Sequence, residues 1–362
     1  MNQDNRMALA LGRALAGGPV SVSAPCRVDM GGTLDLPAFH YPLRRLSPVT
    51  VNIALSMRTR ASLSAWEPGR VRVRSLGFPD AEFPAGAAPY DHPLGMMFAL
   101  CDCFAASGAC LAVESASPPR SALGGSSVAA VAVISAFGAA LAREGFPAPD
   151  GKATVLLAHA VESAVAGVVC GLQDQLAAAF GGVNAWTWTG EPHEGGFCRE
   201  ILLSGPGAGE LSSRLLVAYG GAPHESVDIN GQWSRQFLAG RTRGQWEQVA
   251  ELSREFAGSL ANREWDRAKS AMNQEMDLRR EMTPQVLDES CARLVDAARA
   301  AGCGARSTGA GGGGCVWVLG GPGELAAARQ AWEPLLARVP EARILDATVE
   351  EEGVREEVVC SL

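Results

Sequence analysis

A long run of apolar residues predicts a buried helix in the first half of the chain. Residues 128–141 are rich in alanine and valine, and they contain no proline and no charged side chain. A helix that is apolar on every face is buried in a protein core or spans a membrane. This run holds 14 residues, whereas a membrane span needs about 20. We therefore expect a core helix and no membrane span.

Shorter patterns predict a mixture of strands and further helices. Alternating apolar and polar residues are typical of half-buried strands, and apolar spacings of three and four are typical of helices. The expected strands cover residues 20–23, 49–63, 71–75, 111–115, 214–219, 316–319 and 342–349. The expected helices cover residues 1–18, 94–107, 126–141, 152–169, 283–301 and 322–338, with further helical pieces from residue 233 onward.

The length and composition predict two folded domains. The chain has 362 residues, more than one typical domain, and its 47% of apolar residues can supply real cores. Charged residues make up 19%, which argues against wholesale disorder. The glycine-rich stretch at residues 204–209 is a natural linker. We expect one domain over residues 1–205 and a second over residues 206–362.

Net charge and cysteine content limit the classes of binding partner and the cellular compartment that the sequence suggests. The net charge is −8, and no lysine or arginine run marks a surface for nucleic acid or an anionic membrane. A few arginines would still suffice for an anionic small molecule. The ten cysteines are scattered and form no Cys-x-x-Cys, which favours free thiols in a reducing compartment. The N-terminus does not resemble a signal peptide. We expect a cytoplasmic protein without nucleic-acid or membrane partners, and a homodimer is compatible with the sequence.

Residues 118–127, Pro-Pro-Arg-Ser-Ala-Leu-Gly-Gly-Ser-Ser, come directly before the apolar helix. A glycine turn that opens into a helix leaves backbone N–H groups free, and the helix dipole adds positive charge there. Such a helix start suits phosphate. Ser126 and Ser127 could cap the helix, or one hydroxyl could hold a metal ion. The alternative is an ordinary capped helix, since the stretch lacks the Gly-Lys-Ser/Thr of a Walker motif.

Residues 24–37 predict a turn lined with charged side chains. Gly31 and Gly32 stand between Arg27 and Asp35, with Asp29 close by. Carboxylates accept hydrogen bonds from hydroxyl-rich ligands, whereas an arginine suits phosphate. The alternative is a surface loop whose charges are solvated.

Two acidic residues in predicted helices, Glu162 and Asp174, each allow a structural and a functional interpretation. Glu162 lies in a helix of mostly alanine, valine and leucine. A buried acid needs a metal or a polar partner, although most helix glutamates are simply solvated. Asp174 lies between two glutamines at the start of the next helix. It is either an N-cap or a carboxylate that can take or orient a hydroxyl proton.

Residues 309–314 form the densest glycine run, with five glycines in six positions. Glycine weakens both helices and strands, so this run must serve a close backbone approach or positive φ angles. A flexible linker is disfavoured because a buried strand is expected to follow at once. We expect a loop that faces a ligand.

These three turns, in this order and at these spacings, resemble the GHMP kinase superfamily, which includes galactokinase, homoserine kinase, mevalonate kinase and phosphomevalonate kinase. The matching residues are 24–35, 123–127 and 309–314. Residues 31–37, 171–175 and 178–184 look most like the sugar 1-kinases, namely D-glycero-D-manno-heptose 7-phosphate kinase and fucokinase-like enzymes. The resemblance implies an α+β fold of two domains, the first like ribosomal protein S5 domain 2 and the second ferredoxin-like.

The resemblance also implies ATP and Mg²⁺ as cofactors and gives roles to single residues. Asp174 would orient or deprotonate the acceptor hydroxyl, and Arg27 would lie near the transferred phosphate. Glu162 would bind magnesium together with Ser126 or Ser127. Asp35 would bind sugar hydroxyls. The other implied ligand contacts are Arg120, Leu123, Gly124, Gly125, Ser126 and Ser127 for the ATP phosphates, and Gly31, Gly32, Gly311 and Gly312 for the substrate.

The chain departs from the superfamily pattern at three positions. Arg120 and Ala122 stand where glycine is usual, and Arg306 stands where lysine is common. The expected activity is transfer of the γ-phosphate of ATP to a hydroxyl of a sugar or sugar phosphate similar to heptose 7-phosphate. We expect the acceptor to be the anomeric hydroxyl. The alternatives are a non-catalytic sugar or nucleotide sensor on the same fold, and a mevalonate-type kinase or decarboxylase. The Gly-Leu-Gln-Asp-Gln of residues 171–175 favours a sugar.

Overall fold

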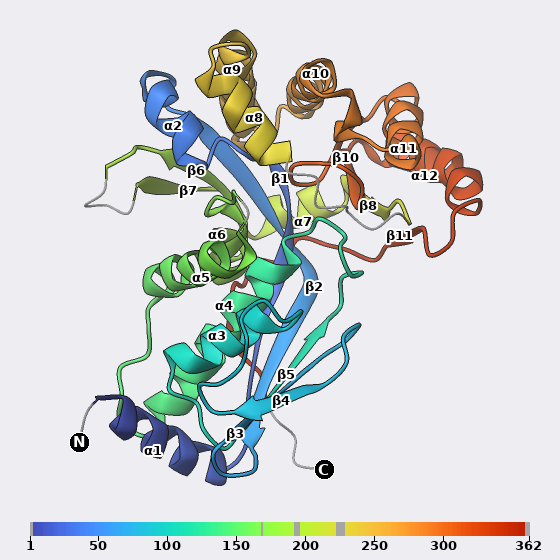
Figure 1. Cartoon of the computed structure of the whole chain (residues 1–362). Coiled ribbons are helices and arrows are strands. Elements are labelled where there is room, and N and C mark those ends of the chain that lie inside the picture. Colours follow the sequence, from blue (N-terminus) through green and yellow to red (C-terminus); the bar gives the residue numbers. More distant parts are fainter. Residues whose placement is uncertain (1–2, 168, 192–195, 222–228, 359–362) are drawn as a thin grey trace.

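The computed structural model describes residues 3–167, 169–191, 196–221 and 229–358. They form two units that each combine helices with one β-sheet. Figure 1 shows helix α1 (Gln3–Ala16) at one end of the molecule and the C-terminal helices at the other. The α+β class that the sequence resemblance implied is therefore confirmed.

Strand β2 (Val49–Ala65) organises the larger sheet, which has eight strands. Its first half pairs with β6 and its second half with β5, so one long strand serves two sections of the sheet. The strand order is β12-β1-β2-β5-β3-β4, with β6 and β7 attached beside the first half of β2. The other strands are β1 (Val20–Met30), β3 (Arg70–Ser75), β4 (Ala81–Pro84), β5 (Ala109–Ser115), β6 (Val183–Trp188), β7 (Phe197–Leu203) and β12 (Arg355–Glu356).

Helix α4 (Gly125–Ala142) is the predicted core helix. It packs against β1 and β2, with other helices around it (Figure 1). These helices are α1, α3 (Gly95–Cys103), α5 (Gly151–Ala166) and α6 (Gln173–Phe180). Among the described residues, α4 alone is long and apolar enough to cross a membrane by length and composition, but 72% of it is buried inside the fold. Its apolar sequence is therefore explained by packing against the sheet.

The second unit is built on an antiparallel sheet in the order β11-β8-β10-β9. Its strands are β8 (Leu215–Tyr219), β9 (Gly304–Ser307), β10 (Cys315–Leu319) and β11 (Arg343–Leu345). Its helices are α8 (Ile229–Leu238), α9 (Arg243–Ala261), α10 (Trp265–Met282), α11 (Glu289–Ala300) and α12 (Pro322–Leu336). Helix α9 also packs on β2 and β7 of the first sheet, so the two units share an interface.

A chain of buried charges crosses this interface. Asp29 of β1 pairs with Arg306 of β9 at 3.1 Å, and Arg306 lies 3.4 Å from Glu275 of α10. Glu275 accepts a hydrogen bond of 2.5 Å from Arg279, which also donates to the carbonyl of Gly32 at 2.6 Å. All four charged side chains are fully buried. Because buried charges are costly without partners, this alternation fixes α10 and β9 on β1.

Several expected elements differ from the structure at their ends. Residues 24–30, predicted as part of a turn, continue strand β1, and the turn begins only at Gly31. The stretch at residues 204–209 runs into helix α7 (Pro206–Ser212), because Pro206 suits the first helical turn. No sequence pattern predicted that residues 346–358 return to the first sheet, where β12 pairs with β1.

Most of the described cysteines are free thiols inside the fold, as expected. The buried ones are Cys26, Cys101, Cys110, Cys291, Cys303 and Cys315. Cys103 and Cys198 are exposed and Cys170 is half-buried. Cys360 lies outside the described residues.

The buried charge chain makes a prediction about stability. Glu275→Ala removes the carboxylate partner of Arg279 and one of the two carboxylates beside Arg306, which keeps only Asp29. We expect the free energy of unfolding to fall by about 3–5 kcal/mol, measured by thermal and urea denaturation. Glu281→Ala, at an exposed position of the same helix, should change it by less than about 0.5 kcal/mol. Equal effects of the two substitutions would show that the buried pairing does not stabilise the fold.

Candidate active site

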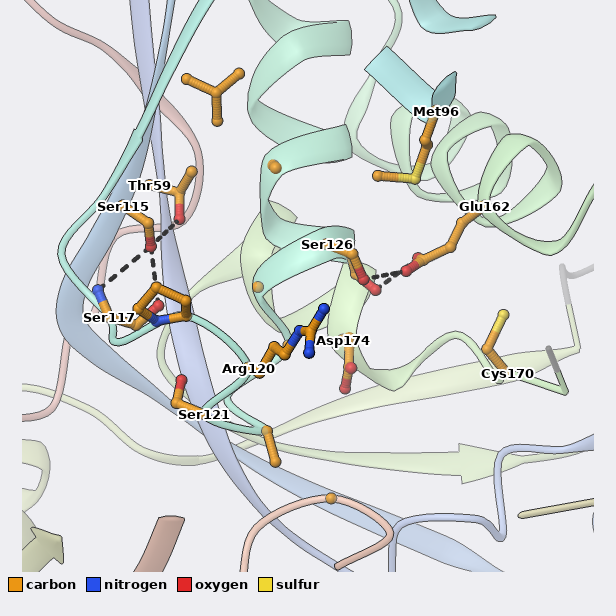
Figure 2. Close-up of a pocket in the computed structure, with 18 of the residues that line it drawn as sticks. Thr59, Met96, Ser115, Ser117, Arg120, Ser121, Ser126, Glu162, Cys170 and Asp174 are labelled. Atoms are coloured by element: carbon orange, nitrogen blue, oxygen red, sulfur yellow. Dashed lines mark hydrogen bonds between the residues drawn. The ribbon is translucent and has the colours of Figure 1, made fainter. Parts of the chain in front are cut away.

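A cavity of about 660 Å³ opens beside the start of α4 (Figure 2). Its walls come from the loop before α4, from α3, α5 and α6, and from the turn after β9. Its size is that of a small-molecule site, since such sites span roughly 300–1,000 Å³. The predicted residues that line it are Arg27, Asp35, Arg120, Gly124, Gly125, Ser126, Ser127, Glu162 and Asp174.

The loop before α4 adopts left-handed backbone at alternate residues. The φ angle is 54° at Arg120, 60° at Ala122 and 83° at Gly124. No side chain caps the helix at Gly124. The first N–H groups of α4 therefore face the cavity without a side-chain acceptor, as a phosphate-binding helix start requires.

Glu162 of α5 is buried against both serines at the start of α4. Ser126 donates to one carboxylate oxygen, and Ser127 donates to the other at 2.6 Å. Gln175 adds a third hydrogen bond of 2.7 Å. The serines thus bind Glu162 and do not cap α4, and Glu162 is not the solvated helix residue that was the alternative. Burial raises the pKa of the Glu162 carboxyl, and these hydrogen bonds offset only part of the rise.

The Ser126 and Glu162 oxygens suit a magnesium ion (Figure 2). Within the described ranges, no group of three or more His, Cys, Asp or Glu side chains could hold a metal ion by itself. Magnesium is usually bound by one or two protein carboxylates together with substrate phosphates and water. The residues present therefore fit an ion shared with a phosphate ligand, and they do not fit a closed protein cage.

Arg27 and Asp174 form a charged pair in the wall of the cavity. Arg27 Nη2 lies 2.7 Å from Asp174 Oδ1, and Nε donates to the same oxygen at 2.8 Å. Arg27 also donates to the carbonyl of Ala122 at 2.7 Å, which ties it to the loop. Asp174 is 24% exposed whereas Arg27 is 3% exposed, so a ligand can reach the carboxylate. Asp174 lies in the first turn of α6 after the N-cap Leu172, so the N-cap alternative is wrong.

Asp29 connects Arg27 with the third glycine run. Its Oδ1 accepts the N–H of Gly309 at 2.6 Å and lies 3.7 Å from Arg27 Nη1. Burial favours the neutral acid, but Arg306 and Arg27 outweigh burial and lower the pKa of Asp29. The ionised Asp29 therefore holds a strand, a glycine turn and the site arginine in one place. Arg306, at the position where lysine is common, pairs with Asp29 and does not line the cavity.

Asp35 lies on the other side of Asp174 in the same cavity. It accepts the N–H of Gln173 at 3.1 Å. A Cβ at Gly171 would lie 1.8 Å from Asp35 Oδ2, so this close approach requires glycine. Burial raises the pKa of Asp35 to about 6. The hydrogen bond from Gln173 acts in the opposite direction but does not outweigh burial.

Five predicted ligand residues do not line the cavity, namely Leu123, Gly31, Gly32, Gly311 and Gly312. Close packing explains the glycine in the third run, because a Cβ at Gly311 would lie 2.2 Å from the carbonyl oxygen of Val286. That run presents Gly309 and Ala310 to the cavity, packs Gly311 and Gly312 on Val286, and packs Gly314 on the loop before α4.

The sequence did not reveal two further parts of the cavity lining, an apolar set of side chains and Asn230. Leu76, Phe78, Met96 and Met97 form the apolar set. They belong to a turn and the start of α3, where no periodic pattern points to a ligand. Asn230 of α8 also lines the cavity, and it accepts a hydrogen bond of 2.9 Å from Thr33. Nothing in the sequence near Asn230 signalled this contact, because it depends on how the two units meet.

Comparison with known families decides what kind of protein this is. Residues 92–182 match the GHMP kinases N-terminal domain, and residues 246–335 match the GHMP kinases C-terminal domain. The chain belongs to the GHMP kinase family. The resemblance carried by the three glycine turns is thereby confirmed. A search of curated protein sequences gives no match.

Solved structures of the GHMP kinase fold extend the likeness over nearly the whole chain. A putative sugar kinase from Campylobacter jejuni is 19% identical with a TM-score of 0.71, covering 94% of this chain and 98% of its own. A D-glycero-D-manno-heptose 1-phosphate kinase from Bacteroides thetaiotaomicron is 14% identical with a TM-score of 0.72 over 94% and 100%. Lactococcus lactis galactokinase in complex with galactose is 15% identical with a TM-score of 0.73 over 97% and 99%. At these identities the likeness concerns the fold.

The raised pKa of Asp35 predicts how stability depends on pH. In the folded protein this pKa is about 6, compared with 3.8 ordinarily. Ionised Asp35 therefore opposes folding, with a cost that appears as the pH rises through about 4 to 6 and is complete above that range. Asp35→Asn stays neutral, so its stability advantage should grow by about 2–3 kcal/mol between low and neutral pH. Urea denaturation of both proteins from about pH 3 to pH 8 measures this difference, and a constant difference would contradict the assignment.

Proposed function

We propose that this GHMP kinase is an ATP- and magnesium-dependent enzyme that transfers the γ-phosphate to a hydroxyl, in first place the anomeric hydroxyl, of a sugar or sugar phosphate. The observation that carries the proposal is the Arg27–Asp174 pair beside the uncapped start of α4 in one cavity. A reachable carboxylate can take a hydroxyl proton, and a buried guanidinium can stabilise negative charge on a transferring phosphoryl group.

Two parts of the cavity lining, the apolar side chains and the start of α4, suit the two parts of a nucleotide. The apolar part around Leu76, Phe78 and Met96 suits a flat base. The N–H groups at the start of α4 suit the phosphates. Phosphoryl transfer requires mainly positioning and neutralisation of charge, and little covalent work from the protein.

Ser126 and Glu162 would hold the magnesium ion. When bound, the ion would supply positive charge to the phosphate oxygens. Glu162 already lies against the serines, so the protein side of such a site exists before a ligand arrives. Gln175 donates to the same Glu162 oxygen as Ser127 and so helps to fix the carboxylate.

Asp174 would remove the proton from the acceptor hydroxyl as its oxygen attacks the γ-phosphorus, and ADP would leave. Arg27 holds the Asp174 carboxylate in place and would lie next to the transferred group. Asp35, which lines the same cavity, would accept hydrogen bonds from further hydroxyls of the acceptor.

Sugars are favoured as acceptors by the Gly-Leu-Gln-Asp-Gln segment and by the sugar kinases among the similar structures. A mevalonate-type kinase is the second candidate, because the mevalonate kinase of Leishmania major has the same fold at 18% identity and a TM-score of 0.65. A non-catalytic sensor is the third, because the phosphate loop departs from the usual glycines. The intact Arg27–Asp174 pair and the Glu162 cluster argue against a sensor.

Asp174→Asn tests the proposed general base. The substitution keeps the size of the side chain but removes its ability to take a proton. With an acceptor that the wild type phosphorylates, kcat should fall by about 100-fold or more while the dissociation constant for ATP stays nearly unchanged. Asp150→Asn, at the exposed N-cap of α5, should keep wild-type kcat because asparagine also caps helices. Turnover that survives Asp174→Asn would overturn the assignment.

Glu162→Gln tests the proposed metal site. Replacing the carboxylate by a neutral amide should raise the magnesium concentration for half-maximal activity by about tenfold or more, since magnesium prefers charged oxygen ligands. Magnesium titrations of the initial rate measure this change. Glu67→Gln, an exposed glutamate between β2 and β3, serves as the control with an unchanged magnesium requirement. An unchanged requirement in Glu162→Gln as well would show that Glu162 does not bind the ion.

A further inference from the structure

Arg120 occupies a backbone conformation that arginine adopts at a cost. Its φ angle is 54°, in the left-handed region that favours glycine. A non-glycine residue there is strained, and at Arg120 this strain coincides with a place in the cavity lining. The chain thus places a large cation where glycine would be the unstrained choice.

The Arg120 side chain has no partner of its own in the described part of the chain. It is exposed, and it makes no side-chain hydrogen bond or ion pair among the described residues. Figure 2 shows it extending from the loop toward the space flanked by Ser126, Glu162 and Asp174. All the N–H donors of its guanidinium are therefore available to a ligand.

Arg120 is also one of two cationic side chains among the described residues that line the cavity. The other, Arg27, is already bound to Asp174 and to the carbonyl of Ala122. The cavity holds three carboxylates besides, those of Asp35, Glu162 and Asp174. A polyphosphate entering this cavity would meet repulsion from these acids, and Arg120 is the cation free to offset it.

We propose that Arg120 is a phosphate-binding residue that recognises the terminal phosphates of the nucleotide. Its planar guanidinium can bind two phosphate oxygens at once, which a glycine loop cannot do. The N–H groups at the start of α4 and the Arg120 guanidinium then hold the polyphosphate from two sides. The inference rests on the proposed nucleotide-dependent function, and it adds a residue that discriminates triphosphate from monophosphate.

The chain itself offers a matched control. Arg263, between α9 and α10, has a φ angle of 58° and is half exposed. Its side chain lies 3.6 Å from Glu210, a surface pair worth little. Arg263→Gly therefore removes the same charge from the same kind of backbone position, away from the cavity.

Calorimetric binding of AMP, ADP and the non-hydrolysable analogue AMPPNP in the presence of magnesium tests the proposal. For Arg120→Gly we expect AMPPNP to bind about 10- to 100-fold more weakly, the loss expected for a charge-assisted hydrogen bond, and AMP to bind within about twofold of wild type. Arg120→Lys should recover part of the affinity, because lysine restores the charge without the fork. Arg263→Gly should bind all three nucleotides like the wild type.

The midpoint of thermal unfolding tests whether weaker nucleotide binding by Arg120→Gly is caused by unfolding of the variant. Replacing arginine by glycine at a left-handed position relieves strain, so the midpoint of Arg120→Gly should not fall below that of Arg263→Gly. The proposal is overturned if Arg120→Gly keeps wild-type AMPPNP affinity, or if it loses AMP and AMPPNP affinity equally. If the wild type binds none of the nucleotides, the proposed function fails instead.

Discussion

The pairing of buried Arg27 with Asp29 and Asp174 is the constraint on which the rest of the site depends. Arg27 can stay charged inside the protein only because carboxylates outweigh the cost of its burial and raise its pKa. Asp29 in turn needs Arg306, and Arg306 needs Glu275. The alternation of charge therefore begins at the cavity and ends on helix α10 in the second unit.

This arrangement lets distant segments set the geometry of one site. The carbonyl of Ala122 and the N–H of Gly309 are both bound to the same charged cluster, so the phosphate loop and the third glycine run are held together. Asp174 is fixed by Arg27 yet remains reachable from the cavity. Such preorganisation is what phosphoryl transfer requires, because catalysis there depends on positioned charge.

The sequence predicted the parts of the site that have local signatures. The glycine turn at the start of α4, Glu162 in an apolar helix, and Asp174 in its amide-flanked segment were all found from neighbouring residues, and all line the cavity. The roles of Gly31 and Gly311 were misjudged, because a glycine required by packing against a distant backbone looks the same in sequence as one required by a ligand.

Long-range contacts could not be predicted in this way. Asp29 forms an ion pair with Arg306, and strand β12 pairs with β1. In both cases the paired residues lie more than 270 positions apart. The fold class was predicted because three motifs in order carry family information, whereas the hydrophobic pattern alone indicated only a mixture of helices and strands. Element ends were misplaced where a strand continues through charged residues, as β1 does.

The most direct measurement of the central claim is ADP release by the wild-type protein with ATP, magnesium and a panel of acceptors. The panel contains heptose 7-phosphate, fucose, galactose, mannose and mevalonate. The account predicts ADP release that depends on one of the sugars, with a phosphorylated sugar as the product. Activity on mevalonate and on no sugar would contradict the sugar assignment. Binding of ATP and a sugar without ADP release would contradict the catalytic role of the Arg27–Asp174 pair.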